Sequence, residues 1–412
     1  MADNVAGTRA FDPLTIGPLT LRNRFIKAAT NEGMAPSGIP SKQLVRFHEG
    51  IAAGGVCMTT VAYCAVSPDA RSFVDQTTLT LGNVPHLKAL TEAVHRQGAA
   101  ASAQITHGGA FTFVKELSSD LPISSSGGFN SIGVLSGKWW RQQMTATHMA
   151  KVTDDFVRGA CLAREAGFDA VEIHMGHGYL LSQFLSPFYN KRRDGYGGTP
   201  EGRARFPAEV LGRVLEAVGK EMAVVCKISV IDGVKPGNTA ADSARIARVL
   251  EAAGAHLLVL SAGLSGASVD TMFGSTFPPA CYPKWMGTTP IAKLAMLLHR
   301  LTARKITFQE MYLLEHARQM RAVTRMPLAY LGGVKTLANV EQALQEGFDA
   351  VALGRALIHD PALIAAFASG QAQTSGCTSC NLCTAMMYTP GGTSCVLGKS
   401  GDVTLNAQPA AS

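Results

Sequence analysis

The sequence contains no long uninterrupted run of apolar residues and no block of like charge. No stretch approaches the roughly 18 apolar residues that cross a bilayer, and the opening segment "MADNVAGTRAFDPL" has no apolar signal core. No basic run is longer than "KRR" at 191–193, although the formal net charge is +7. The sequence therefore has no segment typical of nucleic-acid or membrane binding. We expect a cytoplasmic protein that binds neither.

Charged residues are scarce, at 16%, whereas hydrophobic residues make up 47% of the chain. This balance is typical of an enzyme with a large core and excludes a disordered chain. The length of 412 residues would allow two domains, but α/β barrels often exceed the usual domain length as one unit. The mild excess of positive charge favours anionic substrates or cofactors.

A Gly-x-Gly-x-x-Gly turn is also missing from every expected strand–helix junction, which argues against a doubly wound dinucleotide-binding domain. Short apolar runs recur instead, each followed by an amphipathic segment. Several of these segments end on glycine and lead directly into the next run, as in "AGFDAVEIH", "AGAHLLVLS" and "EGFDAVALG". The repeat is typical of βα units that form a parallel sheet.

Eight such runs predict an α/β fold, a closed TIM (β/α)₈ barrel over residues 1–370, followed by a cysteine-containing tail over 371–412. Two long connections, 108–144 after the third strand and 262–325 after the sixth, are expected at the end of the barrel where active sites form. A buried helix is expected at 296–301, and "YNKRRDGYGG" at 189–198 is expected to be a structural loop. The expected strands are 24–30, 56–63, 100–105, 170–174, 223–229, 256–261, 327–332 and 350–354.

Polar residues stand at the ends of several of these strands, where burial is costly unless the group is used. They include Gln104, His174 and Lys227. The last two strands end in "LGGVKT" and "LGRALIHD", which place glycines and Arg355 where barrels often bind phosphate. Because these residues converge at one end of the barrel, they predict a binding site for a ligand that carries a phosphate group.

From about Phe11 to Phe367 the chain resembles the old yellow enzyme family of FMN-dependent NAD(P)H oxidoreductases. The resemblance is carried by "PLTIGPLTLRNRFIKAAT", "VAYCAVSPDAR", "AQITHGG", "TPEGRARF", "CKIS", "YLGGVKT", "VALGRALIHDP" and, most specifically, "VEIHMGHGYLLSQFLSPFYNKRRDGYGG". It implies an FMN cofactor, with NADH or NADPH as reductant binding only transiently at the flavin.

The resemblance assigns flavin contacts to the ends of six of the expected strands. Gln104 and Lys227 would bind the polar edge of the isoalloxazine, where Lys227 retains the charge of the arginine common in relatives but not its planar fork. Tyr63 would contribute its main chain. The flavin would be lined by Ala28, Ala29, Thr30 and Asn31, and its phosphate held by Gly332, Gly333, Gly354 and Arg355.

The same resemblance implies that the enzyme reduces electrophilic C=C bonds. His174 and His177 would donate hydrogen bonds to a carbonyl or nitro oxygen of a small-molecule substrate, which stabilises charge where it develops. Tyr179 would protonate the substrate as the general acid. A metal site at His-x-x-His is disfavoured because no third ligand is evident.

Four cysteines near the C-terminus have the spacing of a metal or cluster site. Cys377, Cys380, Cys383 and Cys395 form a Cys-x2-Cys-x2-Cys-x11-Cys pattern. The pattern resembles the [4Fe–4S] segment of trimethylamine dehydrogenase and 2,4-dienoyl-CoA reductase, which are barrel relatives. A cluster, a zinc ion and free thiols are all retained as interpretations.

Two other enzyme classes are compatible with the sequence. The tail cysteines motivate an amine dehydrogenase or demethylase, although no aromatic bowl for a methylated amine is evident. A non-redox, phosphate-binding barrel would use Lys227 as a Schiff base. A homo-oligomer is compatible with each of these hypotheses.

Overall fold

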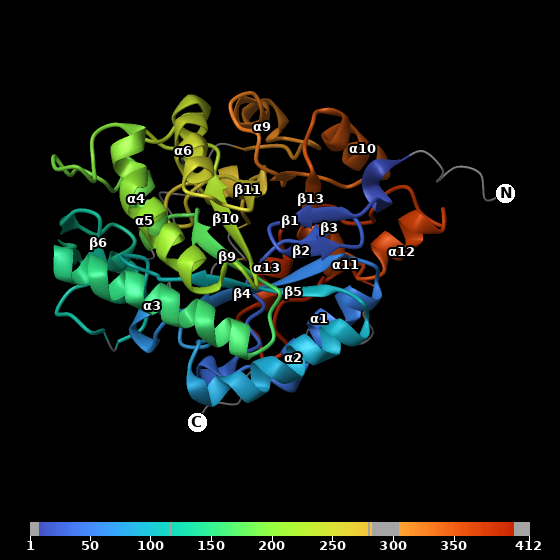
Figure 1. The fold of residues 1–412 in the computed structure, drawn as a ribbon, viewed down its shortest axis with the longest axis horizontal. Coiled ribbons are helices and arrows are strands. Elements are labelled where there is room, and N and C mark those ends of the chain that lie inside the picture. The colour runs from blue at the N-terminus through green and yellow to red at the C-terminus, as the bar shows by residue number, and fades with distance from the viewer. Residues whose placement is uncertain (1–7, 116, 279–280, 282–304, 399–412) are drawn as a thin grey trace.

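Eight parallel strands close into a barrel in the computed structural model, which describes residues 8–115, 117–278, 281 and 305–398 (Figure 1). Every neighbouring pair of barrel strands is parallel. The predicted TIM barrel and its eight strands are therefore confirmed, whereas the helix expected at 296–301 lies outside the described residues. Around the barrel the order is β10 (Ala223–Ser229), β11 (Leu257–Ser261), β12 (Leu328–Tyr330), β13 (Ala350–Leu353), β3 (Phe25–Lys27), β4 (Met58–Ala65), β5 (Ala100–Thr106) and β9 (Ala170–Met175).

Helices form an outer ring around these strands (Figure 1). Threonine side chains cap two of these helices: Thr239 accepts from the backbone of Asp242 at the start of α6, and Thr336 accepts from that of Asn339 at the start of α10. The ring is built mainly by α1 (Lys42–Ala53), α2 (Val84–Arg96), α3 (Ala146–Glu165), α5 (Pro200–Val218), α6 (Ala240–Ala252), α9 (Leu314–Arg321) and α10 (Leu337–Gln345).

A hairpin that the sequence did not predict packs against the N-terminal ends of the barrel strands. It consists of β1 (Leu14–Ile16) and β2 (Leu19–Leu21), which pair antiparallel. Its apolar side chains cluster with the first inward residues of the barrel, among them Ala170 and Ala223. Burial of these side chains seals the end of the barrel opposite the active site.

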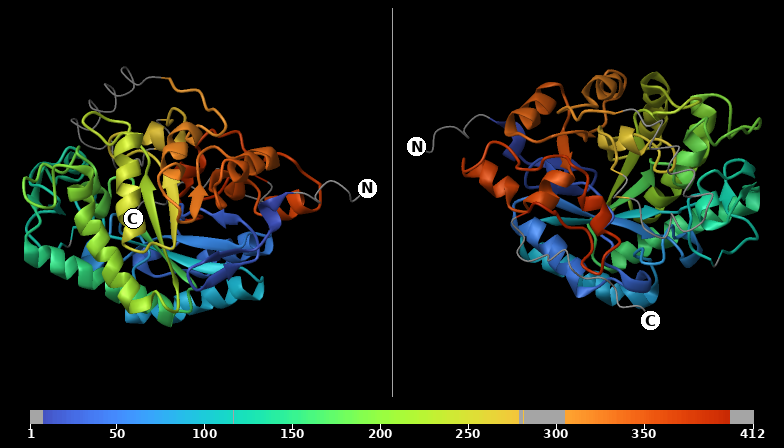
Figure 2. Two further views of the ribbon diagram at one scale, coloured as in Figure 1. Left: turned by 45° about the horizontal axis from the view of Figure 1, so that its top comes forward. Right: turned by 180° about the vertical axis from the view of Figure 1, so that it is seen from behind.

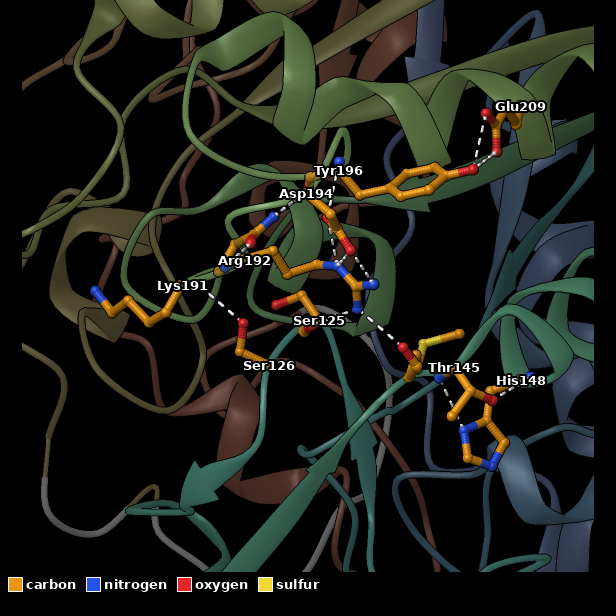
Figure 3. A network of polar contacts seen from close by, with 11 residues as sticks. Ser125, Ser126, Thr145, His148, Lys191, Arg192, Asp194, Tyr196 and Glu209 are labelled. Carbon is orange, nitrogen blue, oxygen red and sulfur yellow. Dashed lines mark hydrogen bonds and ion pairs between the residues drawn. The ribbon is translucent and has the colours of Figure 1, made fainter.

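The connection after β5 carries a small sheet of β6 (Ile123–Ser124), β8 (Trp140–Gln143) and β7 (Gly128–Phe129). Arg192 anchors it from the 189–198 loop, because its Nη1 donates to the carbonyls of Ser125 and Met144 (Figure 3). The same guanidinium is paired with Asp194, with 2.6 Å between Nη2 and Oδ2. These contacts give the 189–198 loop the structural role expected from its sequence.

The chain crosses the C-terminal end of the barrel after α11 (Arg355–His359) and α12 (Leu363–Ala368). We call residues 371–398, which include the short helix α13 (Cys383–Met386), the tail segment. Figure 2 shows it in red across the middle of the barrel when the molecule is viewed from behind. The tail segment is tied to α10 because Leu337 N donates to Gln373 O and Ser375 N donates to Lys335 O.

Candidate active site

A cavity of about 620 Å³ opens at the C-terminal end of the barrel, between the strand ends and the tail segment. Its size is typical of a cofactor or small-molecule site. All fourteen residues predicted to bind flavin or substrate line it, although they come from seven of the eight strands and the loops that follow them. They are Ala28, Ala29, Thr30, Asn31, Tyr63, Gln104, His174, His177, Tyr179, Lys227, Gly332, Gly333, Gly354 and Arg355.

The two histidines stand side by side, with ring centroids 5.0 Å apart. Burial and the nearby cation of Lys227 lower both pKa values, that of His177 to about 3, so both rings are neutral at physiological pH. His174 Nδ1 accepts from the backbone N–H of Gly176 at 3.3 Å, which puts the ring proton on Nε2. Neutral donors of this kind can polarise a ligand oxygen.

Ser261, at the end of β11, is a site residue that the sequence analysis missed. Its Oγ lies 2.7 Å from Nε2 of His177 and it lines the cavity. His177 has a φ of 61°, an uncommon backbone conformation for a non-glycine residue, and its amide donates to Ser229 Oγ. The two contacts hold the ring of His177 in place. The position of Ser261 at the end of an expected strand was the sequence signal that could have identified it as a site residue.

Tyr179 is part of a chain of hydrogen-bonded side chains. Asn31 Nδ2 donates to the hydroxyl of Tyr63 at 3.4 Å, and the hydroxyls of Tyr63 and Tyr179 are hydrogen-bonded to each other. Burial raises the pKa of Tyr179 to about 12, although the hydrogen bonds from Tyr63 and Ser265 lower it. Tyr179 therefore keeps its own proton and can donate it into the cavity, where its ring lies 4.6 Å from that of His174.

Glu172 is a second residue that the sequence analysis missed. Its Oε1 accepts a hydrogen bond of 2.5 Å from Gln104 Nε2 and lies 3.8 Å from Lys227 Nζ. All three side chains are nearly inaccessible to solvent, so the carboxylate fixes the direction of both predicted flavin contacts. Glu172 shares the inward face of β9 with His174, and this alternation in "VEIH" was the signal that could have identified it.

Several features suit the phosphate-bearing flavin implied by the sequence. The hydroxyl of Thr30 is buried at the cavity with no hydrogen-bond partner in the described protein, so a ligand can use it. Gly332 and Gly333 have φ values of 150° and 80°, and a Cβ on Gly332 would lie 2.8 Å from that of Leu313. Arg355 follows Gly354 and supplies the cation. These residues fit an FMN group.

The tail cysteines approach the same cavity without forming a metal site. Cys377 and Cys383 line it, and burial raises the pKa of the Cys383 thiol to about 12. Cys395 Sγ lies 3.3 Å from Nδ1 of His359. Throughout the described chain, Cys380 and the other three tail cysteines included, no three His, Cys, Asp or Glu side chains are placed to hold a metal ion. The predicted cluster or zinc ion is therefore not supported.

Comparison with known proteins identifies the family. The model of the NADH:flavin oxidoreductase / NADH oxidase family matches residues 9–274. A 4,4'-dithiodibutanoate disulfide reductase of Rhodococcus erythropolis is 40% identical and is covered over 94% of both chains. An NADH oxidase of Thermoanaerobacter brockii is 29% identical over 89% of this chain, which spans only 52% of that longer protein.

Solved structures show the same fold. Morphinone reductase superimposes with a TM-score of 0.68 at 23% identity, covering 92% of this chain and 94% of that one. An old yellow enzyme homologue from Zymomonas mobilis gives a TM-score of 0.70 at 22% identity, covering 93% and 98%. At this level of identity the comparison supports a shared fold and nothing more.

The barrel and the family match together define an oxidoreductase. The chain belongs to the NADH:flavin oxidoreductase / NADH oxidase family. The family supports FMN as the cofactor and NAD(P)H as the reductant, and the non-redox interpretation with a Lys227 Schiff base is wrong. No helix in the described parts of the chain has the length and apolar character needed to span a bilayer.

Proposed function

We propose that this enzyme is an FMN-dependent NAD(P)H oxidoreductase that reduces activated C=C bonds, as in enones and related electrophilic alkenes. The observation that carries the proposal is the meeting of His174, His177 and Tyr179 at one wall of the cavity. Two neutral donors and a protonated phenol match what reduction of a conjugated carbonyl requires.

The strand ends would hold FMN. Gln104 and Lys227, oriented by Glu172, would contact the polar edge of the flavin, and the free hydroxyl of Thr30 would bond to it. The phosphate would lie at Gly332, Gly333, Gly354 and Arg355, with Ala28, Ala29, Asn31 and Tyr63 beside the ring system. When bound and reduced, FMN supplies the hydride.

The histidines would bind the carbonyl or nitro oxygen of the substrate. His174 Nε2–H is available because Nδ1 is already an acceptor, and His177 donates from Nδ1 when Ser261 donates to Nε2. Both donors lie in a site shielded from water, which strengthens their effect on negative charge that develops on the oxygen. Their fixed positions also orient the C=C bond.

Tyr179 would complete the reaction by delivering a proton to the α-carbon. The raised pKa keeps the phenol of Tyr179 protonated, and its ring lies beside that of His174 at the cavity, so its proton is available to the substrate. After the transfer, the donor chain from Asn31 and Tyr63 would stabilise the phenolate until solvent restores the proton.

A second candidate activity is the reduction of an organic disulfide. It is favoured by the 40% identity to the R. erythropolis disulfide reductase over almost the full length of both proteins. The electrons balance with the same reductant, since one NADH and one proton convert a disulfide into two thiols. The disulfide would occupy the substrate side of the cavity in place of the alkene.

An anaerobic titration separates these activities. We expect NADPH or NADH to bleach the flavin absorbance of the purified, FMN-loaded protein and cyclohexenone to restore it. Restoration by 4,4'-dithiodibutanoate but not by cyclohexenone would replace the first proposal with the second. Bleaching of the oxidised flavin by trimethylamine with no restoration by either acceptor, or no bleaching by either nicotinamide, would contradict both.

A further inference from the structure

The tail segment forms one wall of the active-site cavity. Thr393 ties it to the loop after β3, because its amide donates to Glu32 O at 2.7 Å and its hydroxyl to Asn31 O at 2.5 Å. On the other side Asn381 accepts from Arg355. The residues between these two attachments, 382–392, therefore span the cavity from the proposed phosphate site to the loop after β3.

Gly33 allows the tail segment to approach closely. A Cβ at this position would lie 2.0 Å from the carbonyl oxygen of Met387, and the φ of Gly33 is 62°. The side chain of Met387 also contacts the loop after β3, with 3.1 Å between its Sδ and Asn31 Nδ2. The space left by the glycine is thus filled by the tail backbone, and this fixes the position of the next residue, Tyr388.

Tyr388 adds an aromatic ring to a cluster that faces the two histidines. The ring centroids of Tyr388 and Phe73 are 6.2 Å apart. Those of Phe73 and Phe111 are 5.9 Å apart, and those of Phe111 and Tyr179 are 5.4 Å apart. All four residues line the cavity. The cavity therefore has a polar end, formed by the histidines, and an aromatic side that leads outward from the proposed general acid.

We propose that Tyr388, with Phe73 and Phe111, forms a subsite for the apolar substituent of the electrophile, and that Tyr388 determines the preference for aryl over small alkyl substituents. The proposal rests on the proposed function and defines its substrate class as aryl- or bulky alkyl-substituted alkenes. Tyr388 is 37% exposed at the cavity edge, so a bound aryl group would cover apolar ring surface that is otherwise in water.

Two α,β-unsaturated aldehydes test the subsite, because they share the conjugated C=C–CHO group and differ only in the substituent that it carries. Cinnamaldehyde carries a phenyl group where crotonaldehyde carries a methyl group. We would measure their dissociation constants for the oxidised, FMN-loaded protein from changes in flavin absorbance, and KM and kcat with NADPH. Tyr388→Ala should weaken cinnamaldehyde binding about tenfold and change crotonaldehyde binding by less than about twofold.

Three further variants make the test specific. Tyr388→Phe keeps the ring and should keep the aryl preference, whereas Tyr388→Leu keeps apolar bulk without aromaticity and should lose part of it. Leu397→Ala, at a position of the tail segment that is 55% exposed and outside the cavity lining, is the matched control and should change neither constant. Thermal melting and FMN content establish that each variant is folded.

The outcomes separate the subsite from the chemistry. Equal effects of Tyr388→Ala on both aldehydes, or an unchanged preference, would overturn the subsite. Equal affinities of the unmodified protein for the two aldehydes would overturn it as well. If both aldehydes bind with the expected preference but neither restores the oxidised flavin, the subsite stands and the proposed C=C reduction fails.

Discussion

Asn381 in the tail segment accepts a hydrogen bond of 2.5 Å from Nη1 of Arg355, at the start of α11. Nη2 of the same guanidinium donates to the carbonyl of Phe273, and the guanidinium carbon lies 5.5 Å from the ring centroid of Phe273 and 5.4 Å from that of Phe308. Within the described residues these two hydrogen bonds use two of its five N–H groups, so the guanidinium can also bind a ligand. The tail segment and the proposed phosphate site are therefore directly coupled.

This coupling predicts that Asn381→Gly weakens FMN binding about tenfold, because a hydrogen bond to a charged group contributes about 1.5–3 kcal/mol. Glycine is the appropriate replacement since Asn381 has a φ of 66°, which alanine would adopt only with strain. FMN titration of the apoprotein, followed by flavin fluorescence, measures the effect. The exposed neighbour Thr378→Ala serves as the control, and unchanged affinity in Asn381→Gly would show that the contact does not position Arg355.

Tyr179→Phe should separate the two halves of the reaction. Reduction of the flavin by NADPH should proceed at the parent rate, whereas its reoxidation by cyclohexenone should slow by about 10²–10⁴, the contribution of a general acid. Because the pKa of Tyr179 is raised to about 12, the acid form persists, and reoxidation should not vary with Tyr179 ionisation below about pH 10. Stopped-flow absorbance measures both steps.

Tyr189→Phe is the matched control for that experiment. Tyr189 is equally buried, and burial also raises its pKa to about 12, but it does not line the cavity. A comparable slowing in both variants would attribute the effect to loss of a buried hydroxyl in general. Parent-rate reoxidation in Tyr179→Phe would require another proton donor.

The buried histidines predict a loss of stability in acid. Burial lowers the pKa of His107 to about 4 and that of His177 to about 3. Below about pH 6.5 the unfolded chain binds these protons and the folded protein does not, so stability falls as the pH drops from about 6.5 towards the folded-state values. Each group contributes a slope of about 1.4 kcal/mol per pH unit over that range.

Urea unfolding at about pH 6 and pH 5 tests this slope. His107→Gln should reduce it by about 1.4 kcal/mol per pH unit, since the variant has no group to protonate there. His86→Gln, at an exposed position on α2, is the comparison. If the three proteins lose stability equally between the two pH values, His107 does not titrate as its burial requires.

The sequence was sufficient to predict the barrel because its strands are short, buried and mostly apolar runs, and most of them follow a helix that ends at a glycine. The small sheet after β5 could not be predicted, since β6 and β7 contain only two residues each and have no detectable period. The β1–β2 hairpin was missed because its three-residue strands gain stability only by burial against the barrel.

The strand-end residues of the site were predictable once the barrel was, because parallel strands bring their carboxyl ends together. The contribution of the tail segment was not, because Tyr388 meets Phe73, and Asn381 meets Arg355, through contacts with no local sequence signal. The sequence analysis therefore found no aromatic bowl, although aromatic side chains distant in sequence gather on one side of the cavity.

Gly33→Ala should displace the tail segment. The new Cβ would collide with the carbonyl of Met387, and the alanine backbone would have to adopt a φ of 62°. We therefore expect the unfolding free energy to fall by about 1–3 kcal/mol. The thiol of Cys383, 8% exposed in the intact protein, should react faster with a thiol reagent. Gly50→Ala is the matched control, because nothing lies within 4 Å of its Cβ and it is inside α1, where alanine should stabilise by about 0.5–1 kcal/mol. If the two variants have equal stability and equal Cys383 reactivity, the tail segment does not depend on its contact with Gly33.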